Sequence, residues 1–447
     1  MKSKPFALAS VAVVASLLTS AVLAGGASVV PPPTVTAVTL VTGTKTMYSP
    51  GTGVANLDAG NLIAGATHWD IFNVGTYFNE SYVGFLWEPV GGPVVMRESV
   101  ATHLEPHFNG PSEIAPNRTV VGTDGFRETL KSYGWLWNPT DGLQFLPTQC
   151  NGPSPAPPDI PTTDCTTVAL AVSDDAGIVA GSVFDSYTSP PQAARWIMKR
   201  TKRGLKATLD IMAPRGAGWS EANDVSADGV VIVGDSGPSD ASFHAAKWTN
   251  DTFSQMQTVG DTSSALFTSV DGLRAIGTAS VGGVTVLVLW AADGTATQFD
   301  PPAGSTIEII NAINPAATVA VGAVSFNLNW APFLWTQAGG FTVLPELDEP
   351  IYDYSEALDV SDDGTVVVGA LLASVYGPGS PRAYGFYWSE RTGLVLINDM
   401  VAAWQPDPPD YYFASAISGD GLRLLATGNP PVGTHDTHSV LVTLEPQ

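Results

Sequence analysis

Three segments of this 447-residue sequence combine aromatic and acidic side chains in a way that suits sugar recognition. Aromatic faces stack on sugar rings, and carboxylates accept hydrogen bonds from sugar hydroxyls. Aromatic residues are also common in protein–protein contacts, and they can simply pack long loops onto the body of a protein, so both alternatives stay open. The candidate ligand-binding residues, in segments 66–83, 346–356 and 399–413, are Trp69, Tyr77, Tyr352, Tyr354, Trp404, Asp407, Asp410 and Tyr411.

The histidines offer a second possible chemistry. All six lie in segments that we predict to be loops, and imidazole with carboxylate can bind a metal ion. Their spacings match no zinc signature, so we predict no metal site and no cofactor. The alternative metal ligands would be the pairs His103 with His107 and His435 with His438.

No motif for covalent or phosphoryl chemistry occurs in the chain. A nucleophile elbow, an HExxH helix and a phosphate-binding loop are all absent from the sequence. The loop carboxylates supply possible acid pairs for glycoside hydrolysis, but 42 acidic residues form such pairs by chance. We therefore predict a non-catalytic binding or interaction protein. The alternative is a secreted hydrolase or lyase that acts on polysaccharide.

A repeat must position these residues. A turn, an apolar run ending in glycine, a gap and an aromatic strand ending in tryptophan recur at intervals of about 43 to 59 residues, which is typical of four-stranded propeller blades. The clearest copies are VSADGVVIVGD with HAAKW and VSDDGTVVVGA with YGFYW. The glycines are Gly65, Gly122, Gly181, Gly234, Gly277, Gly322, Gly369 and Gly428, and the tryptophans are Trp87, Trp137, Trp196, Trp248, Trp290, Trp335 and Trp388.

The repeat predicts an all-β propeller of about eight four-stranded blades, with seven as the alternative. A tryptophan at one repeated position indicates core between blades rather than a ligand site. The last copy ends before a fourth strand, and the alternating segment 34–41 (TVTAVTLV) can supply it. The N-terminal strand would thereby close the ring and remove an exposed sheet edge.

Aspartate–glycine pairs recur at the predicted turn between the first and second strands. A two-residue hairpin needs positive φ at its centre, which glycine adopts without strain. Turn chemistry therefore explains these aspartates without calcium. The pairs begin at Asp228, Asp271, Asp363 and Asp420.

The strand order places all tight turns at one end of the sheets. Connections between second and third strands, and between blades, emerge at the opposite end, and these include the three aromatic segments. Binding residues usually lie in such loops on a rigid scaffold. We therefore expect the ligand, or the active site of the alternative enzyme, at this long-loop face.

The repeat resembles the HAF-type extracellular repeat of secreted bacterial proteins. The phrase before tryptophan is best preserved in His244-Ala245-Ala246-Lys247-Trp248. The resemblance covers roughly residues 50 to 445 and implies the architecture. It implies no catalytic residues.

The first 24 residues read as a signal peptide, with Lys2 and Lys4 before the apolar run from Ala7 to Leu23. Residues 25–447 would then be a single propeller domain, secreted or periplasmic, without a membrane span. In an oxidising compartment Cys150 and Cys165 should form a disulfide. The mature chain has 17 basic and 42 acidic residues, which disfavours nucleic acid as a partner. We expect a monomer that binds an extracellular glycan or protein.

Overall fold

The computed structural model contains 32 strands and one short helix, α1 (Ile397–Val401), among the residues that it describes. Residues 32–447 form one compact unit. The predicted signal peptide lies outside the described residues. These residues are 31–41, 51–58, 61–74, 77–90, 92–98, 106–126, 131–149, 165–186, 189–202, 204–212, 218–327, 329–345, 354–372, 383–404, 410–429 and 438–446.

The strands of the first four sheets follow one another along the chain. Sheet 1 contains β2 (Gly51–Asn56), β3 (Leu62–Val74), β4 (Tyr77–Glu88) and β5 (Gly92–Glu98). Sheet 2 contains β6 (Pro106–Ile114), β7 (Val120–Phe126), β8 (Lys131–Asn138) and β9 (Gly142–Phe145). Sheet 3 contains β10 (Thr166–Val172), β11 (Ile178–Phe184), β12 (Gln192–Thr201) and β13 (Gly204–Ile211). Sheet 4 contains β14 (Trp219–Val225), β15 (Val231–Ser239), β16 (Ser242–Thr249) and β17 (Thr252–Gln255).

Three further sheets repeat this order, and the last one does not. Sheet 5 contains β18 (Thr262–Thr268), β19 (Arg274–Val281), β20 (Val284–Ala291) and β21 (Ala296–Phe299). Sheet 6 contains β22 (Thr306–Ile313), β23 (Val319–Phe326), β24 (Asn329–Thr336) and β25 (Gly340–Val343). Sheet 7 contains β26 (Glu356–Val360), β27 (Val366–Leu372), β28 (Ala383–Ser389) and β29 (Gly393–Leu396). Sheet 8 joins β30 (Asp410–Ile417), β31 (Arg423–Asn429) and β32 (His438–Leu444) to β1 (Val35–Val41).

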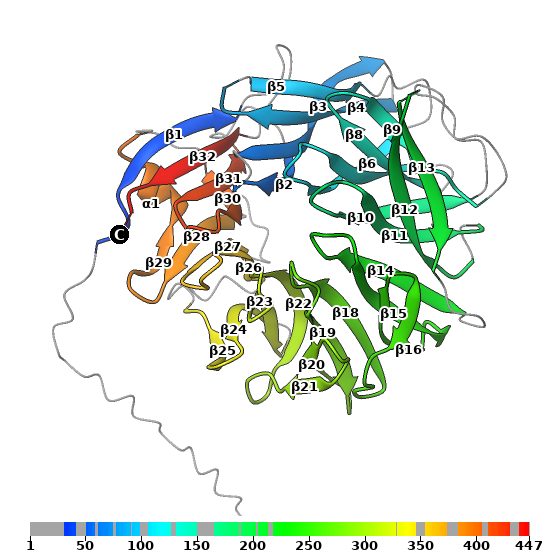
Figure 1. Cartoon of the computed structure of the whole chain (residues 1–447). Helices are drawn as coiled ribbons and strands as arrows, with labels where there is room; N and C mark the ends of the chain where they lie inside the picture. The colour runs from blue at the N-terminus through cyan, green and yellow to red at the C-terminus, as the bar shows by residue number, and fades with distance from the viewer. Residues whose placement is uncertain are drawn as a thin grey trace, which may run out of the picture. The chain divides into compact units, whose positions relative to one another are not determined.

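The eight antiparallel sheets surround a central axis, with the first strand of sheets 1–7, and β30 in sheet 8, nearest to it (Figure 1). We call these eight strands the inner strands. The predicted propeller is confirmed with eight blades, and the alternative of seven is wrong. The N-terminal strand β1 pairs with β32, with Val38 opposite Val442 and Val41 opposite Ser439. The ring is therefore closed by joining the two ends of the propeller within one sheet.

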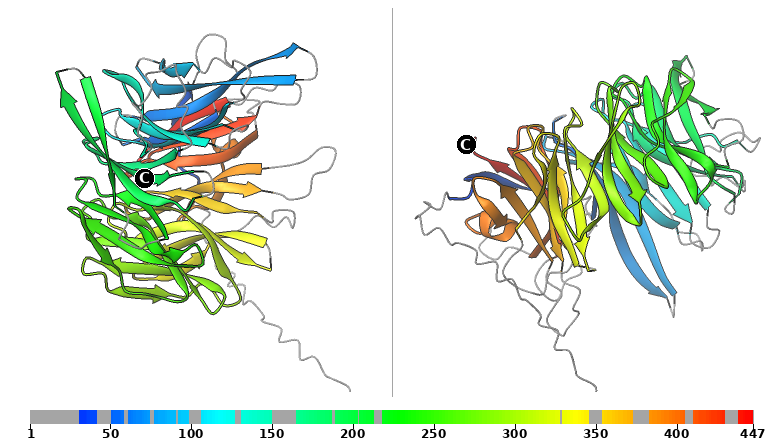
Figure 2. Two further views of the ribbon diagram at one scale, coloured as in Figure 1. Left: turned by 90° about the vertical axis from the view of Figure 1, so that its right-hand side faces the viewer. Right: turned by 90° about the horizontal axis from the view of Figure 1, so that it is seen from below.

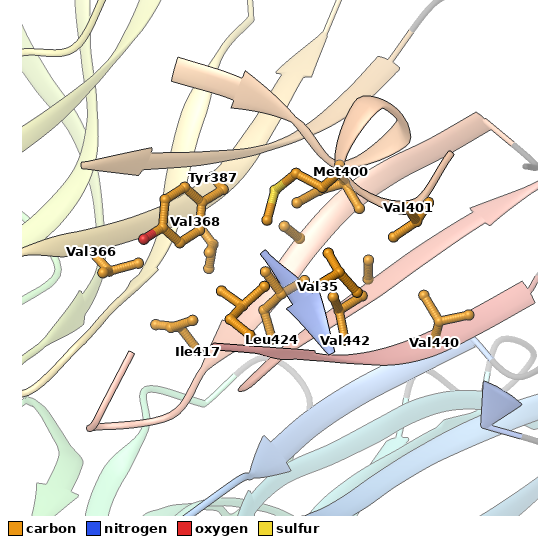
Figure 3. Packing of buried hydrophobic residues seen from close by; sticks show 14 residues of the cluster. Val35, Val366, Val368, Tyr387, Met400, Val401, Ile417, Leu424, Val440 and Val442 are labelled. Carbon is orange, nitrogen blue, oxygen red and sulfur yellow. The ribbon is translucent and has the colours of Figure 1, made fainter. Parts of the chain in front are cut away.

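One cluster of buried apolar side chains fills each of the eight interfaces between neighbouring sheets. The cluster between sheets 7 and 8 brings Val35 of β1 together with Tyr387 of sheet 7 and Met400 of α1 (Figure 3). The repeated tryptophans lie in seven of these clusters, which confirms that they are core. Each one packs toward the preceding sheet, and in sheet 8 Val442 takes this position.

The repeated glycine is explained by a β-bulge. Every inner strand has a register shift at the same place, opposite the second strand of its sheet. A Cβ on Gly277 would lie 1.9 Å from the carbonyl oxygen of Ser264 in the bulged strand, and one on Gly322 would lie 2.0 Å from that of Ile309. In sheet 8 this position is Ala426 rather than the expected Gly428, because Ala426 pairs with Ala414 beside the bulge.

The predicted aspartate–glycine turns are present with positive φ. Gly229 has φ 72° and Gly272 has φ 67°. In sheets 3, 4, 5, 7 and 8 a serine two residues before the aspartate donates to its carboxylate over 2.5–2.9 Å. The aspartates therefore hold their own turns, as the sequence predicts.

Backbone hydrogen bonds also join successive turns around the axis. Ala227 N–H donates to the carbonyl of Val270 over 3.1 Å, and Val270 N–H donates to that of Pro315 over 2.9 Å. Pro315 has no N–H to continue the series. The side-chain amide of Asn314 replaces it by donating to the carbonyl of Asp362 over 2.9 Å.

The close approach at the bulge predicts a large effect of one methyl group. Gly277→Ala should lower the free energy of unfolding by about 3 kcal/mol or more, because backbone must move to relieve the contact. Gly340→Ala is the control, since Gly340 has φ 72° and nothing within 4 Å of an added Cβ. It should cost only about 1–2 kcal/mol of turn strain. Urea denaturation of the two variants measures the difference, and equal losses would contradict this account.

Candidate functional site

The two ends of the sheets differ as the strand order predicts, but several connections are shorter than expected. The long-loop end carries the connections between second and third strands and those between sheets; the short-turn end carries the remaining turns. At the long-loop end β19 and β20 are joined only by Gly282 and Gly283. Segment 66–83, expected as a loop, is mostly the extended hairpin of β3 and β4, which projects beyond the other sheets in both views of Figure 2. The aromatic residues there occupy strands, because their β-branched and aromatic neighbours continue the ladder.

The structure describes the side chains of only two predicted ligand-binding residues. Tyr354 is 43% exposed and Trp404 is 48% exposed, both at the long-loop end. Tyr352 and Asp407 lie outside the described residues. Trp69, Tyr77, Asp410 and Tyr411 lie in strands β3, β4 and β30, and the positions of their side chains are not described.

Tyr354 forms an aromatic pair with Trp330. The sequence predicted the long-loop end as the location of Tyr354, but not this contact. Its ring centroid lies 5.8 Å from that of Trp330, with the planes tilted by 59°. The backbone fixes this contact, since Ser355 N–H donates to the Trp330 carbonyl over 3.1 Å. Tyr354 N–H in turn donates to the Leu372 carbonyl of sheet 7 over 3.1 Å. The pair is therefore held rigidly between sheets 6 and 7 while one ring stays open to solvent.

The histidine prediction needs correction. His107 lies in β6 and His438 begins β32, so neither is in a loop. These residues pair with Gly125 and Gly428 in their ladders, since the strands continue further than turn residues suggested. His103 and His435 lie outside the described residues. Within the described part of the chain, no group of three or more His, Cys, Asp or Glu side chains is placed to hold a metal ion.

A set of buried carboxyl groups along the inner strands was missed. Glu113, Asp224 and Asp359 occupy the same repeat position, directly after the bulge. Each accepts a hydrogen bond from a backbone N–H of the next inner strand, over 2.6–2.8 Å. Burial raises the pKa of Glu113 to about 8 and the pKa values of Asp224 and Asp359 to about 7. These groups join neighbouring sheets, so their position indicates a structural role at the axis.

A pair of neighbouring carboxyl groups lies in sheet 4, towards the long-loop end. Glu221 of β14 is directly opposite Asp235 of β15. Burial, and then the charge of Asp235, raises the pKa of Glu221 to about 7. Burial also raises the pKa of Asp235 to about 6, against the hydrogen bond that Ser264 donates to it. Two neighbouring acids are one part of what the enzyme alternative requires, and access to a substrate is the other.

The repeat contained a signal for two of the buried carboxyl groups of the inner strands, Asp224 and Asp359. Acidic residues precede an aliphatic residue and the turn serine in Asp224-Val225-Ser226 and in Asp359-Val360-Ser361. Aligning the copies by the bulge would have placed both in the inner strand, facing the next sheet.

The short-turn end also contains hollows that sequence reasoning did not expect. A groove of about 820 Å³ lies across sheets 6, 7 and 8, and Tyr387, Arg391, Asp363 and Asp420 are among its lining residues. A smaller one of about 500 Å³ lies between sheets 2 and 3. The turn aspartates on this face are held by their own turns. Hydrogen bonds from Val230 N–H and Ser226 hold the pKa of Asp228 below its ordinary value.

Comparisons with known proteins support the fold alone. No protein-family model matches the sequence, and no curated protein is similar to it. The propeller of Dos1 is 10% identical, with a TM-score of 0.52, over 92% of this chain and 95% of that one. A prolyl endopeptidase is 8% identical, with a TM-score of 0.53, over 78% of this chain. The match spans half the length of that endopeptidase. The propeller domain of the Trilobed protease from Pyrococcus furiosus is 10% identical, with a TM-score of 0.46, over 78% of this chain and 97% of that one.

The raised pKa values predict that stability falls as the pH rises. Between the ordinary pKa of a glutamate, 4.5, and about 8, folded Glu113 keeps a proton that the unfolded chain has lost. The melting temperature, measured with a chelator present, should therefore fall from pH 5 to pH 8. Glu113→Gln should reduce this loss by about 1–3 kcal/mol, since the amide oxygen still accepts the Val172 N–H without carrying a charge.

The exposed Glu445 provides the matched control. Glu445→Gln should leave the slope of melting temperature against pH unchanged. A wild-type curve that is flat between pH 5 and 8 would contradict the assignment of buried, protonated carboxyls. Below about pH 4 the stability should fall for another reason, namely protonation of turn aspartates with lowered pKa values, such as Asp228 and Asp271.

Proposed function

We propose that this protein is an exported, non-catalytic propeller that binds a glycan at the long-loop end. The Trp330–Tyr354 pair, with its exposed tyrosine ring, supports this proposal most strongly. A tyrosine ring left 43% exposed on a rigid aromatic partner presents a flat apolar face beside a polar hydroxyl. Trp404, 48% exposed in the connection before β30, provides a second such face. Flat, pre-organised aromatic faces suit sugar rings because little side-chain entropy is lost on binding.

One observation favours the alternative of a polysaccharide-acting enzyme, namely the Glu221–Asp235 pair. A glycosidase needs both carboxyl groups to contact the substrate. Asp235 is only 3% exposed, and Ser264 of sheet 5 donates to its Oδ2 over 2.7 Å. A sugar cannot reach this carboxyl without separating the two sheets, so binding is the better proposal.

Export also enters as a proposal, carried by the signal-peptide pattern of residues 1–24. Among the described residues, no helix has the length and hydropathy to cross a membrane. The location outside the cell or in the periplasm, the monomeric state and the HAF-type family likeness belong to the same proposal.

The glycan site predicts a loss of affinity on truncation of its rings. A glycan array with residues 25–447 should identify a bound oligosaccharide. Tyr354→Ala and Trp404→Ala should each weaken that binding about 5- to 30-fold, since central aromatic contacts are typically worth more than 1 kcal/mol. Val90→Ala, at an apolar residue that is 98% exposed on the short-turn end, is the control.

Two results would count against this site. If the normally folded protein binds no glycan on the array, a protein partner becomes the better proposal. Glycan binding that both ring variants retain would move the site elsewhere.

Export further predicts that Cys165 pairs with Cys150. Cys165 is fully buried just before β10, and Cys150 lies outside the described residues. Alkylation of the unfolded native protein should label neither cysteine until a reductant is added, as mass spectrometry would show. Reduction should cost about 3 kcal/mol for a loop of this length. Labelling of both cysteines without reductant would contradict the proposal.

A further inference from the structure

The Glu221–Asp235 pair occurs in one sheet only. Glu221 lies just before the bulge in the inner strand, and Asp235 is its partner on the second strand. Each of the other sheets has a corresponding pair of positions. The other seven pairs contain at most one carboxyl group: Gly51–Ala66, Asn109–Thr123, Val168–Ser182, Ser264–Thr278, Ile309–Ala323, Glu356–Ala370 and Phe413–Thr427. The propeller scaffold therefore does not require two acids here.

Neutral polar groups of sheets 4 and 5 lie beside Asp235. Ser264 Oγ donates to Asp235 Oδ2 over 2.7 Å. Asn223, the bulged residue, donates to Ser264 Oγ over 3.1 Å and to the Ala265 carbonyl over 3.0 Å.

One oxygen of the pair lacks a partner. Asp235 is 3% exposed, and its Oδ1 makes no hydrogen bond with any residue that the structure describes. None of the ion pairs in the described part of the chain involves Glu221 or Asp235 either. A buried carboxylate oxygen is costly to leave unpaired, and a like charge directly across the ladder adds to the cost. A bound cation would remove both costs.

We propose that Glu221 and Asp235 bind one calcium ion in the interface between sheets 4 and 5. All the available ligand atoms are oxygens, which favours a hard cation over zinc or copper. The ligand set is only doubly charged and is built on rigid strands, so flexible calcium coordination fits it better than the strict octahedron of magnesium. Two carboxylates with neutral oxygens and water are typical of a site of modest affinity, suited to the millimolar calcium of extracellular fluids. The calcium site does not depend on the glycan proposal.

Calcium titration of the full mature chain at pH 7.5 tests the site. In wild-type protein, calcium at ten times its dissociation constant should raise the melting temperature by about 2 °C. Equilibrium dialysis should give close to one ion per chain, with weaker binding of magnesium. Glu221→Gln and Asp235→Asn should each abolish the shift and the bound ion.

Glu356→Gln is the matched control. Glu356 has the same position in sheet 7, with Ala370 opposite, and its Oε2 accepts a bond from Asn311 over 3.1 Å. This variant should keep the full calcium response. Should Asp235→Asn fail to fold, Glu221→Gln and dialysis still decide the question. Absence of a shift in wild type, or an equal shift in Glu221→Gln, overturns the proposal. If wild type shows no calcium shift and Glu221→Gln is more stable than wild type, the pair holds a proton instead of a cation.

Discussion

The contact between a bulge in each inner strand and the residue opposite it organises this propeller. The bulge pushes a carbonyl onto the second strand, and at Gly181, Gly234 and Gly277 no room is left for a Cβ, which would lie 1.9 Å from that oxygen. It also turns the extra residue toward the next sheet. Ser112, Asn223 and Asn311 thereby donate to the carbonyls of Ala169, Ala265 and Ala357 over 2.8–3.0 Å. One local irregularity, repeated in every sheet, therefore explains the polar contacts between sheets and the glycine that seven of the eight sheets have opposite the bulge.

Polar contacts of this kind matter because the inner strands have no neighbour on the axial side. The N–H and C=O groups on that side would otherwise have only water as a hydrogen-bond partner. Carboxyl groups at Glu113, Asp224 and Asp359 accept three of these N–H groups, but burial favours their neutral form. Hydroxyl groups of inner strands also join sheets, without this cost. Thr167 and Ser220 accept the N–H groups of Gly134 and Ala193, which lie in the third strands of the preceding sheets, over 2.7 and 3.0 Å. The acids thus make the ring sensitive to pH where serine and threonine do not.

Sequence reasoning could predict the repeating features well and the exceptions poorly. The tryptophan period, the positive-φ turns at Gly229 and Gly272 and the closing strand β1 all follow from local patterns of residue type. The Glu221–Asp235 pair depends on register across two strands, which a bulge shifts by one residue and which no local pattern reveals. The candidate site was predicted only in part for the same reason. Tyr354 was identified, but its partner Trp330 comes from another sheet, through a backbone contact that spacing along the chain does not encode.

An internal repeat offers its own control for function. At a position where the eight sheets agree, the shared residue serves the scaffold, as the tryptophans and the bulge glycines do. Where one sheet has a different residue that does not stabilise the fold, that residue needs an explanation other than folding. Val442 replaces a tryptophan with a smaller apolar residue and Ala426 replaces a glycine, and both remain compatible with packing. Glu221 opposite Asp235 places two carboxyl groups at a pair of positions that holds at most one in each of the other seven sheets. Such a pair lowers the stability of the sheet by itself, and a ligand that contributes positive charge is what makes it favourable.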